Sequence, residues 1–364
     1  MMSILFDTSY DHILQRIEQV DPAAYGRTRN FIDGAVTYLS PYISRGVIST
    51  KMVLEHVLNK GYDPQKIEKF IQELAWRDYW QQIWIAKGDE INNDLKHPQP
   101  GVENTAIPAA IVEANTGIDA LDRAIRDFYE TGYLHNHVRM YIAAITCNMG
   151  NSHWKLPAQW MYYHLLDGDW ASNALSWQWV SGTTRNRTYV ANQDNINKYC
   201  RTNQKGTFLD VPYEAFDDFP VPDELRQTIH PELKTVLPET VRPDLDPDLP
   251  VCLYTLYNMD PNWRQEIKAN RVLLLEPEVF AQYPVSGNSI NFLLGLGQNI
   301  DRLQVFTGSF DDFMEEYHPV QVYFKEHPLN RHYRGIEDSR DWMFTVTGYY
   351  PSFFAFWKNC KKEL

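Results

Sequence analysis

The 364-residue sequence predicts a mainly α protein in which a helical domain is followed by a small α/β domain. Up to about Tyr199, apolar residues recur with the spacing of amphipathic helices. After residue 250, short runs rich in Val, Leu, Tyr and Phe alternate with helical segments. The sequence therefore predicts a helical domain over 1–209, a connector over 210–250 and an α/β domain over 251–364.

Three segments of the first domain carry apolar residues at i, i+3, i+4 and i+7. They are STKMVLEHVLNKG, DPQKIEKFIQELAWRDYWQQIWIAKG and GIDALDRAIRDFYETG, which end at Gly61, Gly88 and Gly132. Glycine readily adopts the left-handed conformation that ends many helices. Each glycine therefore predicts a helix end.

The second half of the chain changes in composition. Residues 210–250 are rich in proline and in acidic side chains, which disfavours regular elements and predicts an extended connector. Beyond it we expect strands in VCLYTLYNM, RVLLLEPEVF, LQVFTGSF and VQVYFKE, and helices in SINFLLGLGQNI and FDDFMEEY. The aromatic segment GYYPSFFAFWK predicts a docking or core segment, with a partner surface as the alternative.

The charge of the chain restricts its partners. The formal net charge is -13, so a nucleic acid would have to bind a local basic patch. One basic run contains Arg185, Arg187, Lys198, Arg201 and Lys205, and the alternative is a solvated face. The four cysteines form no CxxC pair, so we expect no metal site and no disulfide framework. Without a membrane-length apolar stretch or a signal sequence, we expect a cytoplasmic protein that does not contact a membrane.

The stretch LLDGDWASNALSWQWVSG concentrates polar and aromatic groups. A helix that begins near Asp169 places Asp169, Asn173 and Trp177 on one stripe, at i, i+4 and i+8. Asp169 would also cap the free N–H groups of the first turn. The alternative is a structural cap followed by buried core tryptophans.

Three further segments place functional groups at helical spacing. ELAWRDYW aligns Glu73 with Trp76 or Arg77, and LHNHVRMYIA places Asn136 on a face with Arg139 or Met140. In VTYLSPYISRG, the hydroxyl residues Thr37 and Ser40 precede Pro41, which predicts a helix start whose free N–H groups and hydroxyls could hold a diphosphate. Each segment also has a structural alternative. These are a solvated Glu–Arg pair beside core tryptophans in ELAWRDYW, structural histidines in LHNHVRMYIA and a capping turn in VTYLSPYISRG.

Taken in order, LSPYISRG, ELAWRDYW, TGIDALDRAIRDFYETGYLHNHVRM and LLDGDWASNALSWQW resemble the FAD-binding helical domain of the photolyase/cryptochrome family. The resemblance extends from about Tyr25 to Tyr199, roughly half of the chain. The N-terminal α/β antenna domain that is usual in the family is not found before this region. The sequence therefore resembles the short photolyase-like branch, and no antenna chromophore is predicted.

The resemblance implies FAD as the cofactor. It assigns flavin-binding roles to Tyr25, Thr37, Leu39, Ser40, Arg77, Arg139, Asp167, Asp169 and Asn173. Asn173 matches the residue that faces flavin N5, where an amide oxygen can accept a hydrogen bond from N5–H and favour reduced flavin. Trp177 and Trp154 match the first two members of a chain that carries electrons to photoexcited flavin. No tryptophan occupies the usual third position, so the chain is expected to end at a tyrosine or to run through Trp160.

The resemblance also implies a substrate. Glu73, Trp76, Met140 and Trp179 match the pocket that faces the lesion in cyclobutane pyrimidine dimer photolyases, and Asn136 lies beside them. The two tryptophans would form apolar walls for a flipped-out dimer, Glu73 would bind the base edge, and His137 would contact phosphate. Enzymes for the 6-4 photoproduct carry histidines at the positions of Asn136 and Met140, which favours cyclobutane dimers here.

The implied function is that of a deoxyribodipyrimidine photolyase, a carbon–carbon lyase that repairs UV-damaged DNA with light, and we expect single-stranded DNA to be preferred. Its catalytic residues would be Glu73, Asn173, Trp177 and Trp154. The main alternative is a cryptochrome-like blue-light photoreceptor, and a weaker one is a nucleic-acid-binding protein with a structural flavin. The sequence predicts no oligomeric state.

Overall fold

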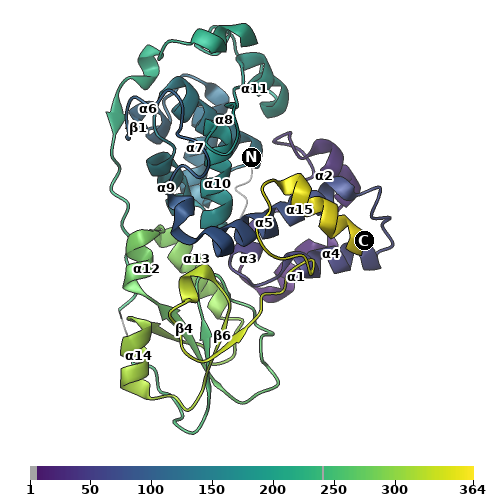
Figure 1. Cartoon of the computed structure of the whole chain (residues 1–364), viewed down its shortest axis with the longest axis vertical. Coiled ribbons are helices and arrows are strands. Elements are labelled where there is room, and N and C mark those ends of the chain that lie inside the picture. The colour runs from purple at the N-terminus through teal and green to yellow at the C-terminus, as the bar shows by residue number, and fades with distance from the viewer. Residues whose placement is uncertain (1–5, 240–241) are drawn as a thin grey trace. The chain divides into compact units, whose positions relative to one another are not determined.

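The computed structural model describes residues 6–239 and 242–364 and divides them into two compact units. Unit 1 contains Asp21–Val36 and Lys87–Glu232. Unit 2 contains Phe6–Val20, Thr37–Ala86 and Leu233–Leu364. Helices dominate the chain up to residue 200, and the larger sheet lies in the C-terminal region (Figure 1). The linear division into 1–209, 210–250 and 251–364 stays a prediction, because the units interleave segments that are distant in sequence.

Unit 1 is helical apart from one short antiparallel pair, β1 (Ile107–Pro108) with β2 (Thr228–Ile229). Its helices are α2 (Pro22–Thr28), η1 (Gly88–Asn92), α6 (Ala109–Val112), α7 (Asp119–Thr131), α8 (Asn136–Ala144), the π-helix η2 (Ile145–Met149), α9 (Lys155–His164), α10 (Trp170–Ser181), α11 (Gln193–Cys200), η3 (Tyr213–Asp218) and η4 (Asp223–Leu225).

The sequence of helix α7 determines both its buried face and its C-terminal end. Its buried residues Leu121, Ile125 and Phe128 recur at helical spacing. The helix ends at Gly132, whose φ of 66° is left-handed, as the sequence predicted. A Cβ on Gly132 would lie 2.5 Å from Cγ of Leu166, so a larger residue would clash there.

Unit 2 combines helices from both ends of the chain. They are α1 (Tyr10–Glu18), α3 (Ser40–Ser44), α4 (Thr50–Asn59), α5 (Glu68–Lys87), α12 (Pro277–Gln282), α13 (Gly287–Gly297), α14 (Phe310–Tyr317), η5 (Pro328–Asn330), α15 (Phe353–Cys360) and η6 (Lys361–Glu363). Helices α4 and α5 lie in segments predicted to be helical, and Gly88 with φ 54° follows α5.

Five parallel strands form the sheet of unit 2: β3 (Val251–Tyr254), β4 (Asn270–Leu275), β5 (Gln304–Thr307), β6 (Val322–Lys325) and β7 (Ile336–Asp338). Their order is β5-β4-β3-β6-β7, with Leu253 opposite Val272. Counted from β3, this is the order of the first five strands of a doubly wound α/β fold. Phe310 and Phe313 of α14 pack against Leu253 and its neighbours on one face.

The structure corrects the expected strands in two places. RVLLLEPEVF was expected to be one β-run, but β4 ends at Leu275 and the rest begins α12, because Pro277 at the first helical position ends the strand and starts the helix. Strand β7 was not predicted, because two of its three residues are charged and the strand is largely exposed, as expected of an edge strand.

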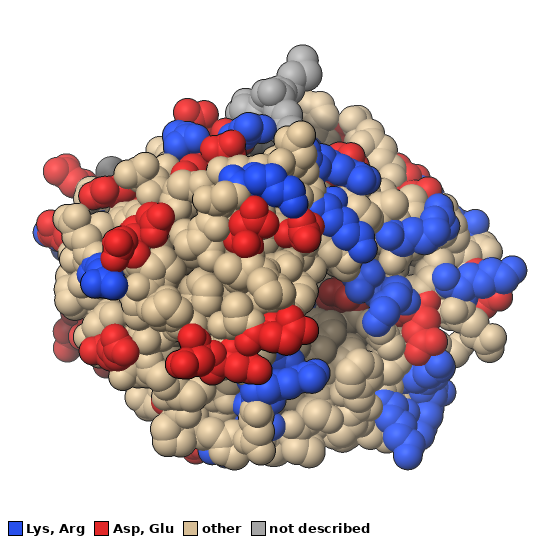
Figure 2. Space-filling model, turned by 90° about the horizontal axis from the view of Figure 1, so that it is seen from above, with Lys and Arg blue, Asp and Glu red and all other residues tan. Residues whose placement is uncertain are grey.

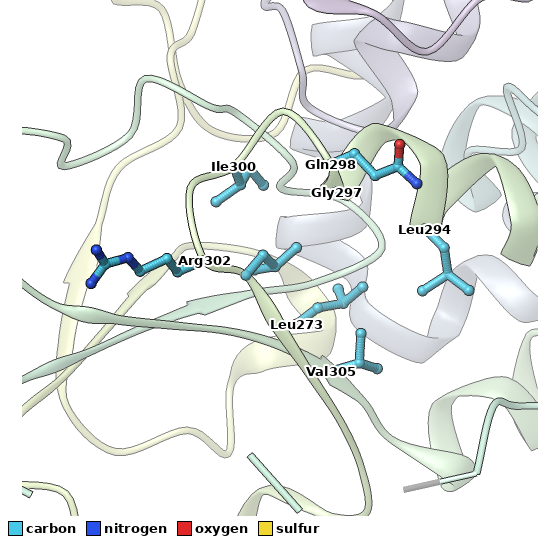
Figure 3. A pocket seen from close by; sticks show the side chains of 8 residues that line it. Leu273, Leu294, Gly297, Gln298, Ile300, Arg302 and Val305 are labelled. Atoms are coloured by element: carbon cyan, nitrogen blue, oxygen red, sulfur yellow. The ribbon is translucent and has the colours of Figure 1, made fainter. Parts of the chain in front are cut away.

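A small pocket lies between α13 and the strands of the same unit. Leu273, Leu294, Ile300 and Val305 give it an aliphatic lining, with Arg302 at its edge (Figure 3). None of the site residues predicted from the sequence lines it. The pocket therefore belongs to the α/β packing and adds nothing to the predicted site.

Candidate functional site

Helix α10 in unit 1 begins where the sequence placed it. Asp169 is its N-cap and accepts a hydrogen bond from the backbone N–H of Ser172 at 2.7 Å. One turn further on, the amide Nδ2 of Asn173 donates to the carbonyl oxygen of Ala158 at 2.8 Å. Both side chains are buried. This bond uses one of the two Nδ2 hydrogens and fixes the amide, whose acceptor for a ligand is the Asn173 oxygen.

Helix α8 and the loop before α10 bring two predicted cofactor residues together. Nη2 of Arg139 donates to both carboxylate oxygens of Asp167, at 3.0 and 2.9 Å. Nε of Arg139 donates to the carbonyl oxygen of Leu134 at 2.8 Å. The Asp167 side chain is only 4% exposed, so its charge depends on this guanidinium. The contact joins residues that are 28 positions apart in the sequence.

The other predicted residues of α8 are more accessible. Asn136 is exposed at the first position of the helix, and Met140 is partly buried one turn later. The His137 ring contacts Tyr141 and Tyr199, with centroids 4.9 and 4.6 Å away. Burial, with a smaller effect of Arg29, lowers the pKa of His137 to about 4. At neutral pH this side chain is therefore uncharged, so it could contact a phosphate only as a hydrogen-bond donor.

The two tryptophans of the predicted electron chain are buried in unit 1. Trp177 lies in α10 and is 2% exposed, and Trp154 is fully buried at the N-cap of α9. Nε1 of Trp154 donates to a carboxylate oxygen of Asp94 at 2.7 Å. No pattern in the sequence pointed to Asp94, because its partner lies 60 residues away.

Trp179, a predicted wall of the dimer pocket, carries a cation on its ring. The guanidinium carbon of Arg185 lies 3.4 Å from the ring centroid, and Nε of Arg185 donates to the Trp179 carbonyl at 3.1 Å. Burial, with repulsion from Arg187, lowers the pKa of Arg185 to about 10, so the group stays charged at neutral pH. Arg185 thus covers one side of an indole that the sequence assigned to the lesion.

The rest of the basic run is partly neutralised. Arg201 pairs with Asp33, and Lys205 pairs with Asp194, at 3.2 and 3.4 Å. Both pairs are exposed, so each contributes little to stability and is easily exchanged for a phosphate. Figure 2 shows Lys and Arg gathered on parts of the drawn face, although the chain as a whole is acidic. A local basic surface is therefore present on a negatively charged protein.

Unit 2 holds three of the four residues predicted for the diphosphate region, Thr37, Leu39 and Ser40, and the fourth, Tyr25, lies in unit 1. Leu39 is the N-cap of α3, Ser40 is the first residue of this helix, and the Leu39 N–H donates weakly to Thr37 Oγ1 at 3.4 Å. Nη1 of Arg77 donates to the Ser44 hydroxyl at 2.7 Å. The structure thus brings Arg77 of α5 to the end of α3, as expected if both segments serve one ligand. Ser44 was not singled out from the sequence.

Glu73 and Trp76 lie on α5 in the same unit. The Trp76 ring is stacked on Phe353 of α15, with centroids 3.8 Å apart and planes inclined by 11°. Trp80 lies against Trp76 at 5.0 Å, and Phe353 is 3% exposed. The sequence singled out the aromatic C-terminal segment but did not predict that it covers this indole.

The predicted site residues thus fall on both units. Unit 1 carries Tyr25, Asn136, His137, Arg139, Met140, Trp154, Asp167, Asp169, Asn173, Trp177 and Trp179. Unit 2 carries Thr37, Leu39, Ser40, Glu73, Trp76 and Arg77. Each unit by itself carries polar groups of the kinds that bind flavin cofactors: hydroxyl and guanidinium groups in unit 2, and carboxylate, guanidinium and amide groups in unit 1.

Candidate metal sites and membrane-spanning helices are both absent from the described residues, 6–239 and 242–364. These residues contain no cluster of three or more His, Cys, Asp or Glu side chains suited to hold a metal ion. No helix among them has the length and apolarity needed to cross a membrane.

Comparison with known proteins identifies the class of this region. Residues 70–212 match the family model of the FAD binding domain of DNA photolyase. The deoxyribodipyrimidine photo-lyase of Alkalihalophilus pseudofirmus is 25% identical over 214 residues, which cover 55% of this chain and 43% of the relative. That of Thermus thermophilus is 30% identical over 164 residues, 43% of this chain and 38% of the relative. A cryptochrome structure from Synechocystis sp. PCC6803 is 20% identical, covers 54% of this chain and 44% of its own, and has a TM-score of 0.46.

The chain therefore carries a photolyase-type FAD-binding region. The resemblance to the photolyase/cryptochrome family, and FAD as the cofactor of this domain type, are confirmed over about half of the chain. The matched part spans about two fifths of the curated relatives.

Proposed function

We propose that the protein is a light-driven DNA repair enzyme that splits cyclobutane pyrimidine dimers. FAD, when bound and reduced, would supply one electron to the dimer after absorbing blue or near-UV light and would receive it back after the ring opens. The reaction thus has no net redox change. The protein would hold the flavin, place the flipped dimer beside it and exclude water.

The observation that carries this proposal is the fixed orientation of Asn173. Its nitrogen donates to the Ala158 carbonyl at 2.8 Å, which leaves the amide oxygen as the acceptor. An acceptor placed against flavin N5 favours the form that bears a hydrogen there, which is a reduced form. A buried, pre-oriented amide does not have to reorganise when the flavin binds.

Charged residues in each unit support the cofactor assignment. The Arg139–Asp167 pair is held by two hydrogen bonds, and a third ties Arg139 to the backbone. Such a pair presents its remaining hydrogen-bonding atoms in fixed directions. In unit 2, Arg77 donates to Ser44 at the end of α3, the helix whose first residue, Ser40, belongs to the predicted diphosphate segment.

Glu73, Trp76 and Trp179 would bind the dimer. The indoles offer apolar faces on which pyrimidines stack, and the Glu73 carboxyl group would hydrogen-bond the base edge. Met140 and Asn136 would complete the pocket, and they stand where enzymes for the 6-4 photoproduct are expected to carry histidines. His137, uncharged at neutral pH, and the cations of the basic run would contact phosphate.

One observation favours the alternative, a cryptochrome-like photoreceptor. Phe353 covers a face of Trp76, as the centroid distance of 3.8 Å shows. A photoreceptor does not have to bind a dimer, so a Phe353 ring that permanently covers one face of Trp76 would not impair its function. In the repair enzyme the dimer either uses the opposite face of Trp76 or displaces Phe353.

The test is a repair assay on the full chain, after absorption spectroscopy has established the bound flavin. Chemically reduced protein is incubated with a thymine-dimer oligonucleotide, single-stranded or double-stranded, under blue light or in the dark. We expect the dimer to be lost only in the light, and faster from single strands. Glu73→Gln, which keeps the shape of the side chain, is expected to slow repair without loss of flavin.

Bound flavin with no repair of either strand contradicts the proposal and leaves the photoreceptor. Equal repair of both strands supports the enzyme and contradicts the strand preference.

A further inference from the structure

The buried indole of Trp154 is linked to the protein surface by two ionisable side chains of unit 1. Its Nε1 donates to Oδ1 of Asp94 at 2.7 Å, and the same oxygen lies 3.1 Å from Nε2 of His153. Trp154 is fully buried, whereas the side chains of Asp94 and His153 are 24% and 25% exposed. A proton that leaves the indole thus has a continuous route to solvent.

We propose that Asp94 is the proton acceptor of Trp154 when this tryptophan is oxidised in the light. His153 Nδ1 accepts from the backbone N–H of Lys155, so its Nε2–H donates to the same Asp94 oxygen and favours later release of the proton to solvent. The inference rests on the proposed flavin photochemistry, with photoexcited oxidised flavin as the one-electron oxidant. It makes the Trp154–Asp94–His153 group the end of an electron chain whose usual third tryptophan is missing from the sequence.

The step balances as one electron and one proton. Trp154 gives one electron to the oxidised Trp177, which has itself passed an electron to the photoexcited flavin. The N–H bond of the Trp154 radical cation then breaks, its proton goes to the Asp94 carboxylate, and a neutral indole radical remains. Return of the electron requires return of the proton, so charge recombination is slowed. The carboxylic acid, whose side chain is 24% exposed, then releases the proton to solvent and restores the acceptor.

The acceptor is held in place before the reaction. Oδ2 of Asp94 accepts from the backbone N–H of Gln99 at 2.8 Å. Gln99 in turn accepts from the backbone N–H of Trp154 at 2.9 Å and donates to the Ser152 carbonyl at 2.9 Å. One glutamine therefore fixes both the carboxylate and the start of the indole's helix. Such preorganisation favours proton transfer because no side chain has to rotate first.

Another buried tryptophan of the same unit provides an internal comparison. Trp170 also donates its Nε1 at 2.7 Å, but to the amide oxygen of Asn92. An amide oxygen accepts a hydrogen bond but is too weak a base to retain a proton. Asn92 and Asp94 are two residues apart, so two similar indole bonds differ mainly in the basicity of the acceptor.

An indole–carboxylate bond is not by itself evidence of electron transfer. In unit 2, Trp263 donates to Asp338 at 2.8 Å and Trp342 to Glu326 at 2.7 Å. What distinguishes Trp154 is its match to the electron chain together with an imidazole on the same carboxylate oxygen, where Asp338 carries the Arg264 guanidinium instead. The test must therefore observe the radical itself.

The experiment is laser-flash transient absorption on the full chain loaded with oxidised FAD, in H2O and in D2O. The tryptophan radical cation and the neutral radical have different absorption bands. We expect the native protein to form the neutral radical, more slowly in D2O. Asp94→Asn is expected to leave the radical as the cation and to speed recombination at least about tenfold, the rate change that ~1.4 kcal/mol in barrier produces.

Two further variants serve as controls. Asn92→Asp makes the reverse exchange beside Trp170 and should leave the radical unchanged. His153→Phe keeps the Trp154–Asp94 bond and should still give the neutral radical, with slower proton release to a pH-indicator dye because the carboxylate loses a hydrogen-bond donor that favours its ionised form. If Asp94→Asn does not fold, Trp154→Phe, which should abolish the long-lived radical, decides the question.

Several results overturn the inference: the same radical and lifetime in Asp94→Asn as in the native protein, an unchanged radical yield in Trp154→Phe, or no tryptophan radical in the native protein. Repair by chemically reduced enzyme needs no electron from Trp154. Loss of repair in the native protein therefore contradicts the proposed function, whereas a failed radical test with intact repair contradicts only this inference.

Discussion

Asp78 is predicted to make the stability of unit 2 depend on pH. This carboxyl group is buried on α5, beside the predicted site residues of that helix. It accepts hydrogen bonds from the Thr50 hydroxyl at 3.0 Å and from the Met343 backbone N–H at 3.0 Å. The second bond holds the C-terminal segment that leads to Phe353. Burial outweighs these bonds and raises the pKa of Asp78 from 3.8 to about 6.

The sign follows from proton binding in the two states. Because the folded protein binds this proton more tightly than the unfolded chain, the contribution of Asp78 is fully present below pH 3.8 and is lost as the pH rises through about 6. The difference between these pKa values corresponds to about 3 kcal/mol. Asp78→Asn, neutral at every pH, should therefore raise the free energy of unfolding at pH 7.5 by up to about 3 kcal/mol.

Urea unfolding of both proteins between pH 4 and pH 8 measures this difference, which should shrink toward zero at the acid end. Thr50→Val, which removes a hydrogen bond to the carboxylate, should move the transition to higher pH. Parallel pH profiles for the native protein and Asp78→Asn would refute the reasoning, because the charge of Asp78 would then carry no folding cost.

Further predictions concern the proposed site. Phe353→Ala should lower the free energy of unfolding by about 3–5 kcal/mol. Phe354→Ala, where the side chain is 65% exposed, should change it by less than about 0.5 kcal/mol, and equal losses in urea unfolding would contradict the buried stack. Asn173→Leu should make the reduction potential of the bound flavin more negative in a spectroelectrochemical titration; an unchanged potential would remove its assigned role. Arg139→Met removes the guanidinium that pairs with the buried Asp167 carboxylate and should cost up to about 3–5 kcal/mol. Arg201→Met breaks an exposed pair and should cost less than about 1 kcal/mol, so similar costs would show that burial does not matter here.

Local features of the fold were predictable where a short stretch of sequence determines them. The N-cap at Asp169 and the left-handed end at Gly132 depend on neighbouring residues, and the structure has both. The transition after Leu275 was not predicted, because an apolar run continues through it and only the proline marks the change. The interleaving of the two units was not predictable either, since it depends on long-range packing.

The contacts of the candidate site were also predictable from the sequence only in part. The family resemblance implied that Arg139 and Asp167 line one ligand, and the structure places the two side chains in direct contact, although their role toward the flavin stays a prediction. Motif spacing could not predict Asp94, which reaches Trp154 across 60 residues, or Phe353, which reaches Trp76 across 277 positions of sequence. Such partners are set by the tertiary fold, and no periodicity in the chain records them.

Both indoles assigned to the dimer already have a partner on one face. In unit 2 the partner of Trp76 is an aromatic ring, and in unit 1 the partner of Trp179 is the guanidinium of Arg185. An aromatic pair contributes about 0.5–1.5 kcal/mol beyond area burial, and a cation over a ring about 0.5–2 kcal/mol. A dimer that displaced either partner would lose that amount of binding free energy, whereas one that used the opposite face of each ring would lose none.

Since Arg185 is only partly buried and Phe353 is almost fully buried, displacement is far easier at Trp179 than at Trp76. We therefore expect Arg185 to swing from the indole to a DNA phosphate on binding, and Phe353 to stay in place as a rigid backing for Trp76. Arg185→Gln should then weaken binding of a dimer-containing oligonucleotide and reduce its salt dependence in a filter-binding titration. Tighter binding by this variant would mean that Arg185 obstructs the pocket instead.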